Sequence, residues 1–216
     1  MRNIFSLPET YQPVRGNKVT TIAKLGKEWR ISFSFQPSNY GLATTGDRAI
    51  GTTNLLHLTL RDNTTDSTGE HGERIPAIFF QPNRGMIVAS SIGDEPNYVQ
   101  DFKADLPPLN QLTKIEVSQL RREGRYTFKI KVGKKELHSV ENEKPQEFTN
   151  VSVYVSNPWL PSTIGKIRDL RIDTNNGGKE SSAHHKKINL SFFVQFNAFG
   201  VSRPIGVNVR PAVEGE

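Results

Sequence analysis

Apolar and polar residues alternate along several short segments of this chain. Trp29, Ile31, Phe33 and Phe35 each precede a polar residue, and Leu56, Leu58 and Leu60 alternate with His57, Thr59 and Arg61 in the same way. A period of two places one set of side chains on a core and the other in water, as in a half-buried β-strand. No window of a dozen residues has helical spacing without an intervening Gly or Pro. The sequence therefore predicts an all-β chain, a two-sheet antiparallel sandwich.

Further strands are predicted from apolar runs and from turn residues. Residues 113–119 and 126–132 form the clearest hairpin, around a turn at 122–125. Gly165 is placed where a close backbone crossing would leave no room for a side chain. The other predicted strands are residues 75–81, 86–92, 136–140, 151–155 and 166–173.

The length and the shifts in composition indicate one domain with a tail. The 216 residues fall within the roughly 200 to 250 that a single all-β sandwich can reach. We expect the sandwich in residues 1–173 and a polar linker in residues 174–187. Residues 188–216 are expected to be a C-terminal extension with one or two strands, or a truncated neighbouring segment.

The charge and the termini bear on partners and location. Lys and Arg total 28 against 22 Asp and Glu, a net charge of +6, but the basic residues are dispersed. A solvated basic surface is therefore expected, with an anionic partner such as acidic glycans or lipid headgroups as the alternative, and no nucleic-acid partner is expected. The chain has no cysteine, no signal peptide at its start and no apolar run long enough to span a membrane. Sequons at Asn63, Asn150 and Asn189 would suit a piece of a secreted protein. The sequence does not indicate an oligomeric state.

Motifs for catalysis and for metal binding are weak. No serine or threonine lies in a glycine-flanked nucleophile elbow. His184 and His185 are adjacent, so on an extended chain they point to opposite faces and do not favour zinc. Asp62, Asp66, Glu70 and Glu73 cluster in one segment, which solubility explains, with calcium as the alternative. We expect no catalytic residues, no metal and no cofactor, with calcium left open.

The two tryptophans have different expected roles. Trp29 is in phase with a buried face and is expected in the core. Trp159 lies between Pro158 and Pro161 in a loop, where an exposed ring could stack on a pyranose. The alternative is that Trp159 caps the edge of the core.

Three segments together resemble the concanavalin A-like jelly rolls, which include laminin-G domains, pentraxins and galectins. They are residues 27–37, with Trp29 to Pro37, residues 113–137, and residues 164–172. The resemblance implies a two-sheet jelly roll whose relatives bind glycans, proteins or lipids at loop edges or on a concave face, some with calcium.

Two narrower resemblances concern candidate site residues. One row of polar residues resembles the sugar-binding row of galectins: His57, Thr59 and Arg61, followed by Glu73 and Arg74. It departs from that pattern in two places, because Thr59 stands in place of an Asn and no Trp precedes Glu73. Residues 153–159 are similar to a stretch in cnidarian-type secreted proteins, which brings no defined activity.

These observations predict a non-catalytic, lectin-like binding or adhesion domain for an extracellular ligand, a glycan or a protein. The expected ligand-binding residues are His57, Arg61, Glu73, Arg74 and Trp159. One alternative is a structural or protein-interaction domain of a matrix or receptor protein. The other is a glucanase-type glycoside hydrolase, which would need a second carboxylate paired with a residue such as Glu116 in an open groove.

Overall fold

A computed structural model describes residues 2–7, 9–40, 51–61, 69–81 and 84–175 of this chain. The chain divides into two units, Met1–Glu180 and Ser181–Glu216. The second unit lies outside the described residues, and so do His184, His185 and the predicted extension at 188–216. The described part contains strands and no helix, so it includes no apolar helix that could cross a membrane.

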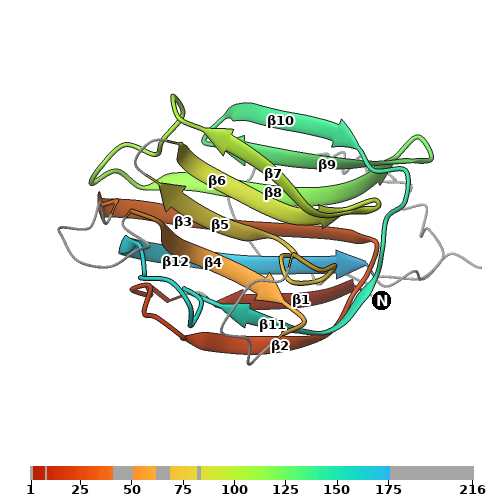
Figure 1. Ribbon diagram of the computed structural model, residues 1–216, viewed down its shortest axis with the longest axis horizontal. Helices are drawn as coiled ribbons and strands as arrows, with labels where there is room; N and C mark the ends of the chain where they lie inside the picture. The colour runs from red at the N-terminus through yellow and green to blue at the C-terminus, as the bar shows by residue number, and fades with distance from the viewer. Residues whose placement is uncertain (1, 8, 41–50, 62–68, 82–83, 176–216) are drawn as a thin grey trace, which may run out of the picture. The chain divides into compact units, whose positions relative to one another are not determined.

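The described strands form two antiparallel six-stranded sheets, a jelly-roll β-sandwich (Figure 1). This confirms the predicted fold class. Sheet A contains, in order, β1 (Arg2–Leu7), β12 (Ile164–Asn175), β3 (Glu28–Asn39), β8 (Thr113–Arg122), β9 (Arg125–Val132) and β10 (Lys135–Glu141). Sheet B contains β2 (Lys18–Leu25), β11 (Phe148–Tyr154), β4 (Thr53–Thr59), β5 (Ala77–Gln81), β6 (Gly85–Ile92) and β7 (Glu95–Phe102).

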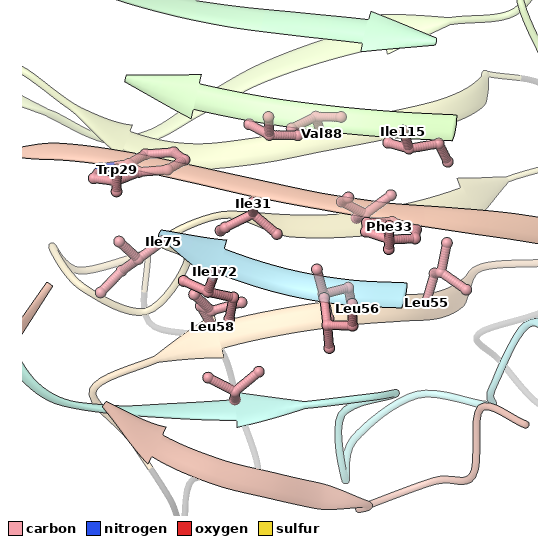
Figure 2. Close-up of a cluster of buried hydrophobic side chains, with 14 of the residues drawn as sticks. Trp29, Ile31, Phe33, Leu55, Leu56, Leu58, Ile75, Val88, Ile115 and Ile172 are labelled. Carbon is pink, nitrogen blue, oxygen red and sulfur yellow. The ribbon is translucent and has the colours of Figure 1, made fainter. Parts of the chain in front are cut away.

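The core lies between the inner faces of the two sheets. In β3, Trp29, Ile31, Phe33 and Phe35 are buried and the residues between them are partly exposed, as the alternation predicts. Figure 2 shows Trp29, Ile31 and Phe33 together with Leu56 and Leu58 of β4, so side chains from both sheets share one cluster. Burying each such side chain stabilises the fold by roughly 1.5 to 3 kcal/mol.

Gly165 allows β12 to approach β3 closely. A Cβ atom at this position would lie 2.5 Å from the backbone oxygen of Gln36 and 2.7 Å from the Phe35 ring. Since only a residue without a side chain fits there, the predicted close crossing is confirmed.

Strand β4 departs from the predicted alternation. We expected Leu56, Leu58 and Leu60 to face the core and His57, Thr59 and Arg61 to face water. Instead every residue of Thr53–Thr59 is buried, with His57 4% and Thr59 1% exposed, whereas Leu60 is 42% exposed. Leu56 and Leu58 face the core as predicted, but the prediction is wrong for His57 and Thr59, because the outer face of sheet B is also covered along β4, β5 and β6. Its outer face carries a second apolar cluster of Ala77, Phe79, Ile87 and Ala89.

Candidate functional site

His57 is covered on the outer face of sheet B by its contacts with Glu73 and Asn157. Its Nε2 atom is 2.7 Å from the backbone oxygen of Glu73, and its Nδ1 atom is 3.1 Å from the side-chain nitrogen of Asn157. The Asn157 amide nitrogen can only donate, so Nδ1 accepts and the Nε2–H group donates to Glu73. Both ring nitrogens are therefore used inside the protein.

The electrostatics of His57 agree with this geometry. Burial lowers its pKa to about 4, although the hydrogen bond to the Glu73 backbone acts in the opposite direction. The imidazole is therefore neutral at physiological pH. We conclude that His57 links β4 to residue 73 and to the loop after β11, a structural role.

Glu73 and Arg61 form a second internal cluster. Glu73 is buried; its Oε2 atom accepts a 2.7 Å hydrogen bond from the Gly69 nitrogen, and its Oε1 atom lies 3.4 Å from Arg61 Nη1. Arg61 also pairs with Glu70. These two carboxylates are thus engaged with Arg61, and Asp62 and Asp66 lie outside the described residues. Within the described ranges, no group of three potential metal ligands is found.

Arg74 lies over a ring on the same face of sheet B. Its guanidinium carbon is 5.6 Å from the centre of the Phe79 ring, and its Nη1 atom donates to Asn97 Oδ1. Burial lowers the pKa of Arg74. The side chain is partly exposed, so a charged group borders the apolar cluster of sheet B.

Trp159 is partly exposed at the end of a row of rings. Its ring centre is 5.3 Å from that of His57 and 6.5 Å from that of Tyr154, and His57 in turn meets Phe79 edge-on at 6.0 Å. The row crosses β5, β4 and β11, with Arg74 at one end and Trp159 near the other. The structure is therefore compatible with both roles considered for Trp159, a stacking ring and a cap on the protein interior, because the ring covers part of sheet B and also reaches solvent.

Trp159 belongs to the loop that runs from β11 to β12, residues 155–163, called here the Trp159 loop. Asn157 holds it from within, because its Oδ1 atom accepts hydrogen bonds from the backbone nitrogens of Trp159 (3.2 Å) and Leu160 (2.9 Å). Asn54 holds Asn157 in turn, through a 2.7 Å bond from the Asn157 nitrogen to Asn54 Oδ1.

A third contact comes from the surface. Arg15 Nε donates to the backbone oxygen of Pro158 at 2.8 Å. The sequence did not single out Asn54, Asn157 or Arg15. Asn157 had a local signal, since Asn before Pro favours a turn. The partners of Asn157 and Pro158 are 103 and 143 residues away, so no local pattern reveals them.

A polar hollow adjoins the Trp159 loop at the start of β12. It is lined by Gln12, Pro13, Ser38, Ser162, Thr163, Ile164, Gly165 and Lys166. Hydroxyl, amide and ammonium groups therefore lie together at this end of the sandwich. Val14, next to the hollow in sequence, and Ile164 are exposed apolar side chains, 56% and 52% exposed.

The structure links the five predicted site residues through His57, which contacts Trp159 and the Glu73 backbone, but it does not expose them as one polar row. His57 and Glu73 are buried, and Glu73 contacts Arg61, while Arg74 contacts Phe79. Trp159 and Arg74 belong to one row of contacts, whereas Arg61 lies with Glu70 and Glu73.

No family model and no curated protein matches this chain. Several solved structures are similar to it in fold. The receptor-binding domain of botulinum neurotoxin type G is 10% identical, with a TM-score of 0.41 over 82% of this chain and 43% of its own length. The Ruminococcus gnavus IT-sialidase CBM40 bound to alpha2,3 sialyllactose is 11% identical, with a TM-score of 0.46 over 78% of this chain and 94% of its own length.

A third similar structure is the exoplasmic/lumenal domain of VIP36 in its Ca2+/Man3GlcNAc-bound form. It is 15% identical, with a TM-score of 0.43 over 82% of this chain and 85% of its own length. The chain spans less than half of the neurotoxin domain. The fold class of this chain is defined by its own strand order.

Proposed function

We propose that this chain is a non-catalytic glycan-binding domain, with the Trp159 loop as its binding surface. The observation that carries the proposal is a partly exposed tryptophan in a loop fixed by buried hydrogen bonds. A sugar ring stacks its C–H face on an aromatic ring, and a ring already held in place loses little conformational entropy on binding.

The groups that line the polar hollow suit the hydroxyls of a sugar. Ser162 lines the polar hollow and follows Trp159 by three residues, which is at most about 10 Å of extended chain. Gln12 and Ser38 add an amide and a second hydroxyl to the same hollow. In this proposal Trp159 stacks on the sugar and the hollow supplies hydrogen bonds.

Of the predicted residues, His57 acts on this site indirectly. It positions Trp159 through ring contact and through Asn157, and it does not touch the ligand. Arg74 lies at the far end of the ring row, where it can reach a longer glycan. Glu73 and Arg61 form an ion pair that fixes the residues after β4.

The proposal has no catalytic step. Glu116, the carboxylate that a glucanase-type site would use, faces Arg30 in a hollow on sheet A, and it is the single carboxylate among the described residues that line that hollow. Glycoside hydrolysis needs two carboxyl groups on either side of the scissile bond.

A glycan array with the full chain tests the proposal. We expect the wild type to bind a defined group of glycans and the Trp159→Ala variant to lose at least tenfold in affinity for them. Tyr126→Ala is the matched control, because it removes a partly exposed ring from β9 of sheet A and leaves the Trp159 loop intact. The control should bind within twofold of the wild type.

Two results would refute glycan binding at this loop. One is a wild type that binds no glycan above background, with and without calcium. The other is a Trp159→Ala variant that folds and keeps full affinity.

A second candidate function is protein interaction, and the exposed Val14 and Ile164 favour it. Two apolar side chains exposed at one end of a sandwich are the kind of surface that a protein partner covers. A partner whose binding is lost in Ile164→Ser and kept in Trp159→Ala would favour this function, if the array is also negative.

A further inference from the structure

A second hollow lies on the outer face of sheet A, the other side of the sandwich from Trp159. The cations that line it are Arg30 of β3, Arg122 of β8, and Lys129 and Lys131 of β9. Glu116 is the one carboxylate in its lining. Ser118 and Thr127 contribute hydroxyls. We call this set the sheet A hollow.

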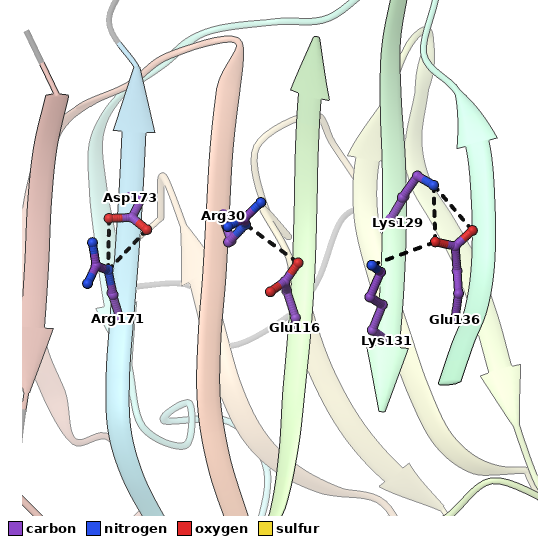
Figure 3. A network of polar contacts seen from close by, with 7 residues as sticks. All are labelled: Arg30, Glu116, Lys129, Lys131, Glu136, Arg171 and Asp173. Carbon is purple, nitrogen blue, oxygen red and sulfur yellow. Dashed lines mark hydrogen bonds and ion pairs between the residues drawn. The ribbon is translucent and has the colours of Figure 1, made fainter. Parts of the chain in front are cut away.

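The strand register brings these side chains together. Ser118 lies opposite both Arg30 on β3 and Lys129 on β9, and Glu116 lies opposite Lys131. Side chains directly opposite in an antiparallel pair are about 5 Å apart at Cβ and share a face. Figure 3 shows Arg30, Glu116, Lys129 and Lys131 on neighbouring strands of one face.

The carboxylates near this hollow do not balance its cations. Glu116 Oε1 lies 3.5 Å from Arg30 Nε, and Glu136 of β10 accepts hydrogen bonds from Lys129 at 3.0 and 3.2 Å. Glu136 also lies 3.9 Å from Lys131. Asp173 of β12 lies opposite Arg30 and pairs with Arg171. Three carboxylates therefore face five cations, so the sheet A hollow and its border carry an excess of positive charge.

The contact between Arg30 and Glu116 leaves the guanidinium of Arg30 short of hydrogen-bond acceptors. Its Nε atom is buried and has no hydrogen-bond acceptor in the part of the chain that the structure describes. The ion pair with Glu116 is a single contact at 3.5 Å, whereas Arg binds an oxyanion most tightly through two parallel N–H bonds. A further oxyanion near this guanidinium would supply acceptors that Glu116 does not.

We propose that the sheet A hollow binds one sulfate or phosphate group carried by a small molecule or a saccharide. Such a group has several oxygens, which can accept from Arg30, Lys129 and Lys131 together, and Ser118 and Thr127 add neutral donors. This site is independent of the Trp159 loop and adds an anionic ligand to the proposed function.

The surroundings favour one isolated anionic group over a nucleic acid. Arg171 donates to Asp173 on β12, and Glu136 stands on β10, so carboxylates border the hollow on both sides (Figure 3). A duplex, with one charge about every 1.7 Å, would meet these carboxylates. The lining residues include no aromatic side chain, which single-stranded bases need for stacking.

Titration calorimetry with the full chain tests this site. The probes are inorganic sulfate, inorganic phosphate, N-acetylglucosamine 6-sulfate, glucose 6-phosphate and a single-stranded oligonucleotide. We expect saturable one-to-one binding of sulfate or phosphate. Tighter binding of one ester than of its inorganic ion identifies whether the natural group is a sulfate or a phosphate ester.

A pair of double variants separates the hollow from overall charge. Lys129→Gln with Lys131→Gln should weaken binding at least tenfold. Lys134→Gln with Lys135→Gln removes the same charge from the β9–β10 turn and the first residue of β10, outside the hollow, and should stay within twofold of the wild type. Urea unfolding of both variants shows that each is folded.

The outcomes are distinct. Equal weakening in the two double variants, or no saturable binding of any small probe, would overturn the proposal. Tighter binding of the oligonucleotide than of every ester, lost in the hollow variant, would assign the surface to nucleic acid instead. Trp159→Ala should leave sulfate and phosphate binding unchanged, so failure here is distinguishable from failure of the glycan site.

Discussion

The outer faces of the two sheets differ in composition and in cover. On sheet A, the outward residues of β3 are Arg30, Ser32, Ser34 and Gln36, all partly exposed. On sheet B, the outward residues of β5 and β6 include Phe79 and Ile87, both buried in a small apolar cluster. An outer face with polar side chains at alternate positions can be exposed to solvent. An apolar outer face has to be covered by further protein. The Trp159 loop and residues 73–74 provide that cover.

The largest expected effect tests the cover of sheet B. Phe79→Ala removes a buried ring that contacts Arg74 and His57. We expect the free energy of unfolding to fall by about 3 to 5 kcal/mol, as for a large buried side chain. Ser34→Ala, at an outward position of β3, should change it by less than about 0.5 kcal/mol. Urea unfolding at pH 7 measures both.

A small effect at Phe79 would contradict this comparison. If the cost of Phe79→Ala resembled that of Ser34→Ala, the outer face of sheet B would be as open as that of sheet A.

The next effect concerns pH, through His57. Burial lowers the folded-state pKa of His57 to about 4 from 6.5. Between pH 4 and pH 6.5 the unfolded chain therefore binds a proton at this ring more readily than the folded chain does. The neutral ring therefore contributes stability above pH 6.5, and that contribution is lost as the pH falls toward 4. The loss is about 3 kcal/mol.

Comparison with His57→Gln isolates this contribution. Both proteins share the titration of their carboxylates, so the difference between their unfolding free energies should shrink by about 3 kcal/mol between pH 7 and pH 4. A difference that is constant with pH would show that His57 is open to water.

The smallest effect is expected on the charged face of sheet A. Lys131 lies 3.9 Å from Glu136, and both side chains are well exposed. Lys131→Gln should therefore change the unfolding free energy by less than about 0.5 kcal/mol, and less still in 0.5 M salt. Thermal unfolding at low and high salt measures this. A loss comparable to that of Phe79→Ala would mean that the ion pairs of sheet A hold the fold.

The same difference explains which strands could be predicted. β3, β8 and β9 alternate because one face is in the core and the other in water, so their residues reveal both position and orientation. β4, β5 and β6 are buried on both faces, so alternation does not show which of their side chains face the core, and in β4 it wrongly placed His57 and Thr59 in water. β1, β2 and β7 were not predicted. In β7, Pro96 interrupts the pattern and no residue is fully buried, so periodicity gives a weak signal.

The candidate site was predictable only in part. Trp159 could be found because two prolines place it in a loop. The groups that hold it could not, because Asn54 and Arg15 meet the Trp159 loop only after the chain has folded. His57 was predicted to face water as a ligand-binding residue, but it is buried by contacts with Glu73 and Asn157 that alternation does not show.

The two tryptophans allow the most direct test of the account, because Trp29 is buried in the core and Trp159 is held at the surface. NMR spectra of the indole N–H groups can be followed while a glycan selected on the array is added. We predict that the Trp159 signal shifts with saturation and that the Trp29 signal stays in place. A glycan that binds without moving the Trp159 signal would contradict the claim that this loop is the binding surface.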